Sequence, residues 1–205
     1  TKTVPFVMDG RKTYRFVVRW GEERDTDDAE GRVIRSSPSR PTPEAIVALL
    51  PRFSGLIQQV PPRYSAVKVE GERAYDLARD GEVVELAPRP VEIHRLELLS
   101  CPDPDLSILT AECGKGTYVR ALARDMGQML GCYGHVVELR RTAVGPFTEA
   151  IATGLEVLQR AIQAMDDGRP PEPPPLLPVA AGLAALPALR VSQADAGRLA
   201  RGQAV

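Results

Sequence analysis

The feature that most constrains this chain is residues 114–147, which carry the start and stop signals of a helix and then a strand pattern. Apolar residues recur with the i, i+3, i+4, i+7 spacing of an amphipathic helix; they are Val119, Leu122, Ala123, Met126 and Leu130. Thr117 is the expected N-cap, and Gly131 is expected to end the helix. Residues 135–141 then predict a strand flanked by cations.

A basic turn, Gly114-Lys115-Gly116, opens this stretch, and Arg120 and Arg124 lie one turn apart on the polar face of the expected helix. A helix N-terminus favours anions, although the same pattern also fits an ordinary helix with solvated arginines. The net charge of −1 by itself argues against nucleic acid. However, residues 114–141 hold five cations against two acids, and residues 22–30 hold six acids. Such polarisation can steer RNA to one face of a protein.

Bulk composition predicts one moderate globular domain, or one domain with part of another. The chain has 205 residues, of which 43% are hydrophobic and 26% charged. The sequence has no apolar run near the roughly 20 residues of a membrane span and no signal-peptide pattern, so we expect a cytoplasmic location. Its three cysteines are widely spaced and it has two histidines. We therefore predict no metal site and no disulfide framework.

The rest of the chain predicts an α+β fold. Residues 12–20 alternate cleanly and indicate a half-buried strand, and further strands are expected around residues 91–95 and 106–112. Thr42 and Pro43 are the start signals of a helix that runs to about Phe53. A short helix is expected over residues 72–79, whereas residues 1–6 show no helix or strand signal. Short turns between strands favour a mixed, largely antiparallel sheet with flanking helices.

The C-terminal region predicts a change of organisation. A capping box at residues 153–156 starts a helix with an apolar side, and six prolines within residues 170–178 indicate a stiff linker. Residues 179–205 contain one short helix, with Ser192 as N-cap and Gly202 as its end. We divide the chain into residues 1–165, a linker at 166–178, and the start of a small C-terminal domain at 179–205, which is too short to fold alone.

Three motifs carry a family resemblance: KGTYVR at residues 115–120, LRR at 139–141 and YSAVK at 64–68. Together they resemble the tRNA pseudouridine synthases of the TruB type, over about residues 1–158. The resemblance implies a pseudouridine synthase-like catalytic domain, here incomplete, and an RNA-binding C-terminal domain. It also implies an isomerase that converts uridine to pseudouridine in the T-loop of tRNA, using the T-arm stem-loop as its partner and neither metal nor cofactor. We expect a monomer.

The same resemblance assigns roles to residues around a flipped base. It implies that Tyr14 stacks on the uracil, an interaction of about 1–3 kcal/mol per base, and that Tyr118 helps to enclose the nucleotide. Arg120 corresponds to the arginine that pairs with the catalytic carboxylate, Leu139 to a residue that contacts the uracil, and Asp28 to an acid near the pocket. Alternation alone places Tyr14 instead as the first position of the core face, so both interpretations stay open.

The expected RNA contacts are basic residues outside this pocket: Arg63, Lys68, Lys115, Arg140 and Arg141. The family's nucleophile is an aspartate in a Gly-x-Leu-Asp stretch, which this sequence does not contain. Residues 1–3 resemble the segment that follows that motif, so we expect the aspartate upstream and assign no nucleophile here. The chain as given is then expected to be inactive, and Arg120 is expected to face solvent or another acid.

A non-catalytic RNA-binding or RNA-folding module fits a chain without a nucleophile. A nucleotide-binding enzyme with a phosphate loop around Lys115 does not fit, because Gly116 and Leu109 stand where that loop needs Ser or Thr and Gly.

Overall fold

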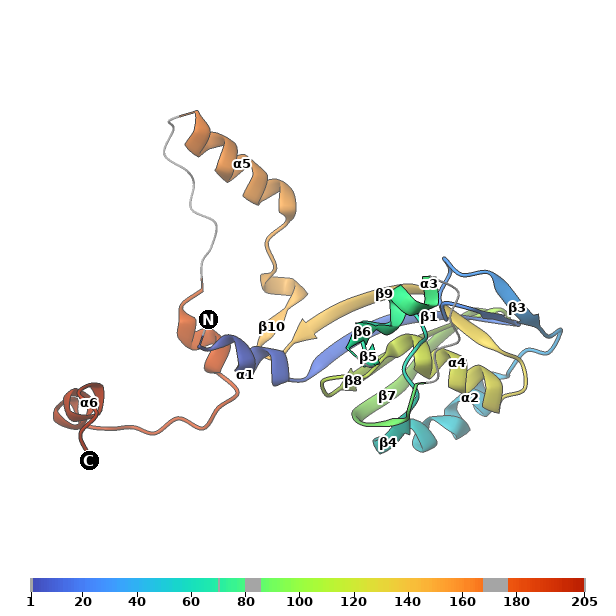
Figure 1. Cartoon of the computed structure of the whole chain (residues 1–205), viewed down its shortest axis with the longest axis horizontal. Helices are drawn as coiled ribbons and strands as arrows, with labels where there is room; N and C mark the ends of the chain where they lie inside the picture. Colours follow the sequence, from blue (N-terminus) through green and yellow to red (C-terminus); the bar gives the residue numbers. More distant parts are fainter. Residues whose placement is uncertain (1, 70, 80–85, 168–176, 205) are drawn as a thin grey trace.

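The computed structural model describes residues 2–69, 71–79, 86–167 and 177–204, and its central feature is a six-stranded sheet (Figure 1). The strand order is β10-β9-β1-β8-β7-β4. These strands are β1 (Lys12–Trp20), β4 (Gly55–Gln59), β7 (Arg89–Asp103), β8 (Leu106–Cys113), β9 (Gly134–Val144) and β10 (Phe147–Thr148). Two small pairs accompany the sheet: β2 (Glu22–Arg24) with β3 (Val33–Ser36), and β5 (Lys68–Val69) with β6 (Glu72–Arg73).

The helices are α1 (Val4–Asp9), α2 (Pro43–Leu49), α3 (Ala74–Arg79), α4 (Val119–Met129), α5 (Leu155–Asp166) and α6 (Gln193–Ala200). Short 3-10 turns are η1 (Leu50–Phe53), η2 (Glu149–Ile151) and η3 (Val179–Leu183). Within the described ranges the paired strands are antiparallel, and the one parallel contact is an isolated bridge between Asp28 and Val136. The predicted α+β class with a largely antiparallel sheet is confirmed.

Strand β1 lies inside the sheet, and its predicted bounds are confirmed. The predicted alternation holds except at Val17, which lies on the other face and is nevertheless only 6% exposed. Strand β1 pairs with β8 on one side and β9 on the other. Phe16, Val18 and Trp20 are at most 1% exposed, whereas Arg15 and Arg19, which alternate with them, are exposed. The buried strand residues form one hydrophobic cluster with the apolar sides of α2, η1 and α4. This core fixes α4 against the sheet.

Two of the helix starts that define the core were predicted, and one of them differs in detail. Helix α2 begins as expected, with the Thr42 hydroxyl accepting a hydrogen bond from the Ala45 amide at 3.2 Å. Helix α4 begins one residue later than expected, since its N-cap is Tyr118. The Tyr118 side chain makes no capping hydrogen bond. The Thr117 hydroxyl donates to the Gly114 carbonyl instead, at 3.2 Å. Gly131, at φ +70°, ends α4 as predicted.

Three other expectations were wrong or incomplete. Helix α3 begins at Ala74 and not at residue 72, because Glu72 and Arg73 pair with β5. The N-terminal segment forms α1, although the sequence gave no helix signal there. The expected capping box before α5 is not formed, since Gly154 is the N-cap and no side chain bonds to it.

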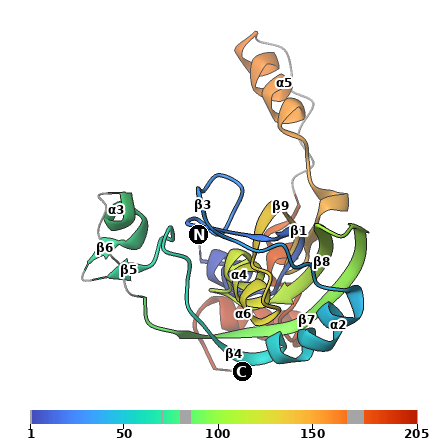
Figure 2. The same ribbon diagram turned by 90° about the vertical axis from the view of Figure 1, so that its right-hand side faces the viewer.

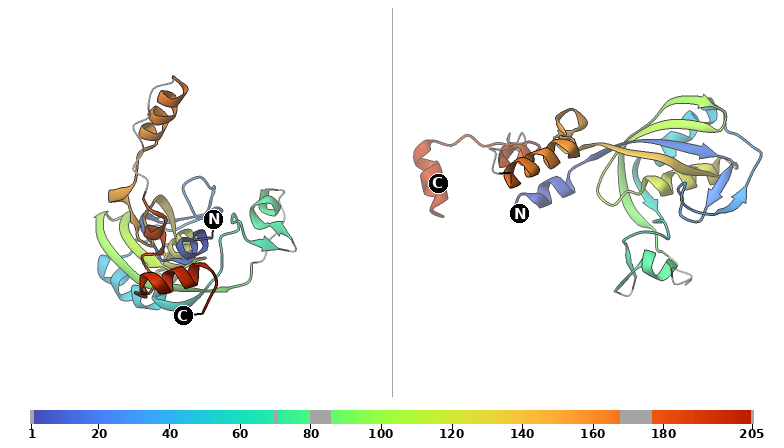
Figure 3. Two further views of the ribbon diagram at one scale, coloured as in Figure 1. Left: turned by 90° about the vertical axis from the view of Figure 1, so that its left-hand side faces the viewer. Right: turned by 90° about the horizontal axis from the view of Figure 1, so that it is seen from above.

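Helix α5 projects away from the sheet beyond β10 (Figure 1). Its apolar side is therefore exposed, including Leu155, Ile162 and Met165, each at least 60% exposed. Most of the predicted linker at 166–178 lies outside the described residues. Beyond it, η3 and α6 lie at the end of the molecule where α1 lies (Figure 3). Ser192 caps α6 as predicted, accepting from the Asp195 amide at 3.1 Å. The division into domains stays a prediction.

No helix within the described ranges has both the length and the apolar character needed to cross a membrane.

Candidate active site

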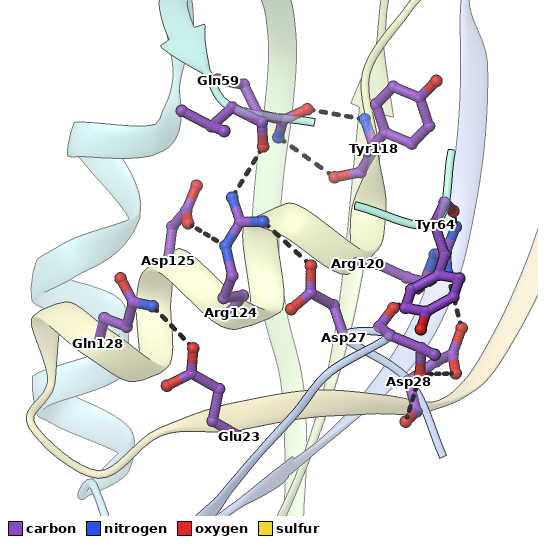
Figure 4. Close-up of polar contacts among 12 residues, drawn as sticks. Glu23, Asp27, Asp28, Gln59, Tyr64, Tyr118, Arg120, Arg124, Asp125 and Gln128 are labelled. Carbon is purple, nitrogen blue, oxygen red and sulfur yellow. Dashed lines mark hydrogen bonds and ion pairs between the residues drawn. The ribbon is translucent and has the colours of Figure 1, made fainter. Parts of the chain in front are cut away.

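The polar face of α4 meets the acidic segment (residues 22–30) through side chains spaced by four residues. Arg120 Nη1 donates to Asp28 Oδ2 at 2.8 Å, and Arg124 Nη1 donates to Asp27 Oδ2 at 3.0 Å (Figure 4). One turn further along α4, Gln128 donates to the Glu23 carboxylate at 3.2 Å. Because residues four apart lie on one face of a helix, this face is matched to the acids of the segment one by one.

Arg120, near the start of α4, has three acceptors. Besides Asp28, it donates to the Thr26 carbonyl at 3.0 Å and to the Tyr64 carbonyl at 2.7 Å. Its side chain is 24% exposed, so the guanidinium is held in place while one side still reaches solvent. The expectation that Arg120 faces solvent or another acid is therefore met by Asp28.

Arg124 lies deeper and is enclosed by acceptors. It donates to Asp27, to Asp125 at 2.7 Å and to the Val60 carbonyl at 2.8 Å. The Asp27 side chain is only 7% exposed, and burial raises its pKa to about 6, although Arg124 opposes that shift. Burial also raises the pKa of Asp125. The contact with Asp27 holds the acidic segment against α4 one turn after Arg120.

The backbone of the acidic segment turns at Asp27, which has a φ of +62°. Aspartate and asparagine tolerate this left-handed region better than most residues. The Asp27 carbonyl accepts from the Val136 amide at 3.1 Å, which ties the turn to β9. The Thr26 hydroxyl donates to Asp28 Oδ1 at 2.6 Å. These hydrogen bonds hold the Asp28 carboxylate toward Arg120.

Tyr14 lies on β1 beside a cavity of about 640 Å³ that extends to the turn before α4. Lys12, Lys115, Thr117 and Arg141 are among the other residues that line it. Tyr14 is partly buried and packs against the core cluster, so it takes part in the core and also faces the cavity. Its register partner on β9 is Arg141. The structure thus brings Tyr14, Arg141 and the turn preceding Tyr118 to one hollow.

Leu139 lies next along β9 on the same face as Arg141, two residues away. It is the register partner of Phe16, yet it is 50% exposed. Leu139 is not among the residues that line the cavity. As an exposed leucine two residues from Arg141, it offers an apolar contact for a flat ring.

The five predicted RNA contacts do not form one cluster. Lys115 pairs with Asp9 at 2.9 Å, Arg140 forms an ion pair with Glu149, and Arg141 lines the cavity. Arg63 lies in the segment after β4, and Lys68 begins β5. The hairpin of β5 and β6, together with α3, lies to one side of the six-stranded sheet (Figure 2). Their assignment as RNA contacts stays a prediction.

Sequence reasoning missed the contacts that hold the site in place. The spacing of Arg120, Arg124 and Gln128 could have indicated a face matched to the acidic segment. No sequence signal pointed to the Tyr64 carbonyl as an acceptor for Arg120. Across the parts of the chain that the structure describes, no group of three or more His, Cys, Asp or Glu side chains is placed to hold a metal ion.

Comparison with solved structures defines the class of fold. The chain resembles one in a Cbf5-Nop10-Gar1 complex, with a TM-score of 0.58 and 23% identity over 82% of this chain and 41% of that one. It also resembles a chain of an H/ACA RNP bound to a substrate RNA containing 2′-deoxyuridine, with a TM-score of 0.55 and 18% identity, covering 89% of this chain and 42% of that one. The chain therefore shares its fold with these two chains.

Family models and relatives identify the family within that class. The model for the N-terminal domain of TruB family pseudouridylate synthase matches residues 1–119, and the model for the C-terminal domain of tRNA pseudouridylate synthase B matches residues 120–183. The chain belongs to the TruB family, as the motifs predicted.

Similar proteins named tRNA pseudouridine synthase B occur in Rhodopseudomonas palustris (66% identical over 205 residues) and Bradyrhizobium diazoefficiens (65% identical over 205 residues). The protein of that name in Agrobacterium fabrum is 55% identical over 207 residues. All of this chain is covered in each comparison, but only 56%, 59% and 66% of the respective relatives. The chain thus spans little more than half the length of the first two.

Proposed function

We propose that this chain is part of an isomerase that converts uridine to pseudouridine in the T-loop of tRNA. Family membership and the name shared by its relatives support this assignment. The observation that carries it is the placement of Arg120, which three acceptors fix at the start of α4. The turn just before this helix, residues 114–117, lines the same cavity as Tyr14.

The reaction exchanges one bond to the ribose for another. The glycosidic N1–C1′ bond breaks, the uracil turns, and a C5–C1′ bond forms, while C5 loses its proton and N1 gains one. Since no electrons leave the substrate, neither a metal nor a redox cofactor is required. The protein has to extrude the base, hold it while it is detached, and place a carboxylate beside it.

The residues of this chain supply the holding and orienting functions. Tyr14 stacks on the base, Leu139 gives it an apolar contact, and Tyr118 closes the pocket. Arg120 keeps an approaching carboxylate ionised and oriented, because a neighbouring guanidinium lowers a carboxyl pKa. That carboxylate is the aspartate of an upstream Gly-x-Leu-Asp stretch, and Asp28 holds Arg120 in readiness for it.

The partner is the T-arm stem-loop, and we infer that the protein acts on it in the cytoplasm as a monomer. Arg63, Lys68, Lys115, Arg140 and Arg141 are proposed to contact RNA phosphates.

The test uses the full-length protein and a T-arm stem-loop that carries tritium at C5 of its uridines, because forming the new C–C bond releases that tritium. We expect tritium release by the full-length protein and near-complete loss of release in Arg120→Ala. The control is Arg19→Ala, which should release tritium like wild type, because Arg19 is exposed and lies on the face of β1 opposite to Tyr14. Stem-loop binding without any release by the full-length protein would identify a non-catalytic RNA-binding module instead.

A further inference from the structure

Gln59, the last residue of β4, is a buried amide with both ends bonded to a single distant residue. Its side chain donates from Nε2 to the Tyr118 carbonyl at 3.2 Å and accepts at Oε1 from the Tyr118 amide at 2.8 Å (Figure 4). Gln59 is 2% exposed. One side chain therefore makes with Tyr118 the reciprocal pair of bonds that two strands would make with each other.

These bonds serve the start of α4, which has no cap of its own. The first amides of a helix lack partners within the helix and need an acceptor from elsewhere. Tyr118 provides no side-chain cap, and the Thr117 hydroxyl is bonded to Gly114. Gln59 therefore supplies, from β4, a hydrogen bond to the amide of the N-cap residue.

The segment after Gln59 continues along α4 and holds its two arginines. The Val60 carbonyl accepts from Arg124 at 2.8 Å, and the Tyr64 carbonyl accepts from Arg120 at 2.7 Å. Between them, Pro61 and Pro62 are buried and restrict the backbone to an extended form. The position of Arg120 thus depends on residues 59–64, and the hydrogen bonds of Gln59 to Tyr118 hold the start of this segment against α4.

We propose that Gln59 is a positioning residue: it fixes the backbone of Tyr118 and, through the first turn of α4, the direction of Arg120. This role rests on the proposed function, because it assigns to Gln59 an effect on the rate of the reaction in addition to its effect on the stability of α4. An apolar side chain of similar size could fill the same space, but it could not orient both the amide and the carbonyl of Tyr118.

The test compares Gln59→Leu with Gln58→Leu in the full-length protein. Gln58 is the preceding residue and is exposed, so it controls for the loss of an amide in the same strand. In single-turnover reactions with the enzyme in saturating excess over the stem-loop, we expect the rate constant of Gln59→Leu to fall about 10- to 100-fold, the effect of a small misplacement of catalytic groups. Its Kd for the stem-loop should stay within about twofold of wild type. Gln58→Leu should match wild type in both.

A purely structural role has a different signature. It would lower the fraction of enzyme molecules that bind the stem-loop in a titration, because fewer molecules are folded, and leave the rate constant measured with folded enzyme in excess unchanged. That result, or a wild-type rate constant in Gln59→Leu, would overturn the positioning role. Absence of conversion by the wild-type protein would overturn the proposed function instead, and hydrogen exchange at the Tyr118 amide would still report whether Gln59→Leu frees that amide.

Gln59→Glu gives a second reading if the leucine variant does not fold. An ionised glutamate accepts from the Tyr118 amide but cannot donate to its carbonyl, whereas a protonated one can do both. We expect its rate constant, relative to wild type at the same pH, to be lowered at neutral pH and to recover as the pH falls. A ratio of one at every pH would contradict the proposal.

Discussion

Arg120 and Asp28 form a direct ion pair, with Nη1 of the arginine 2.8 Å from Oδ2 of the aspartate. The arginine expected to accompany the catalytic carboxylate is thus already held by an acid of the same chain. Both side chains are about a quarter exposed, so the pair borders solvent.

The first prediction concerns the strength of this pair. In a double-mutant cycle of Arg120→Ala and Asp28→Ala, urea unfolding should give a coupling energy of about 1 kcal/mol, because the pair is partly shielded and embedded in further hydrogen bonds. The control is Arg11 with Glu112, a more exposed pair at 2.9 Å, which should couple by less than about 0.5 kcal/mol. Equal coupling in the two cycles would contradict a special role of the α4 contacts.

The second prediction is a pH dependence set by Asp27. Its pKa is raised to about 6 by burial, so the folded state keeps the proton to higher pH than the unfolded state does. The resulting stability is fully present below the ordinary pKa of about 4 and is lost as the pH rises through 6. Asp27→Asn cannot ionise and suits the positive φ. Its free energy of unfolding should gain up to about 3 kcal/mol relative to wild type between pH 4 and 7. Parallel stability curves for the two proteins would show the assignment to be wrong.

The third prediction concerns Gly127, where α4 touches the start of β9. A Cβ there would lie 2.3 Å from the Gly134 nitrogen and 2.4 Å from the Tyr133 carbonyl carbon, and both are backbone atoms. Gly127→Ala should therefore cost about 1–3 kcal/mol of stability despite the better helix propensity of alanine. Gly197→Ala in α6 is the matched control, since its nearest neighbour would be a side-chain atom at 3.6 Å. Thermal unfolding should show a lower Tm only for the first variant.

The fourth prediction concerns the salt dependence of RNA binding. If Lys115 and Arg141 contact phosphates, replacing either with alanine should weaken stem-loop binding and reduce the slope of log K against log salt by about one. Arg52→Ala, an exposed cation in η1, should leave the slope unchanged. A titration series from low to moderate salt checks this, and unaltered slopes in both variants would remove these residues from the interface.

Local patterns predicted much of the fold. Strand β1 and helices α2 and α6 follow their sequence signals closely, because alternation and side-chain caps involve residues only a few positions apart. Local reasoning failed where a distant partner competed. Thr117 was expected to cap α4, but the Tyr118 amide bonds to Gln59. Likewise, the sequence predicted the apolar side of α5, whereas the exposure of that side follows from the position of the helix away from the sheet.

The sequence by itself determined the family, four of the six strands of the sheet and the identity of the residues proposed to act on a base, because these follow from short motifs and periodicities. Strands β4 and β10 carried no such pattern. Only the tertiary structure decided which acid each arginine of α4 meets and which backbone carbonyls complete its contacts. The reason is physical: Arg120 reaches Asp28 and Tyr64 across 92 and 56 residues of chain. Contacts of that range depend on how the sheet and α4 pack, which no local spacing encodes.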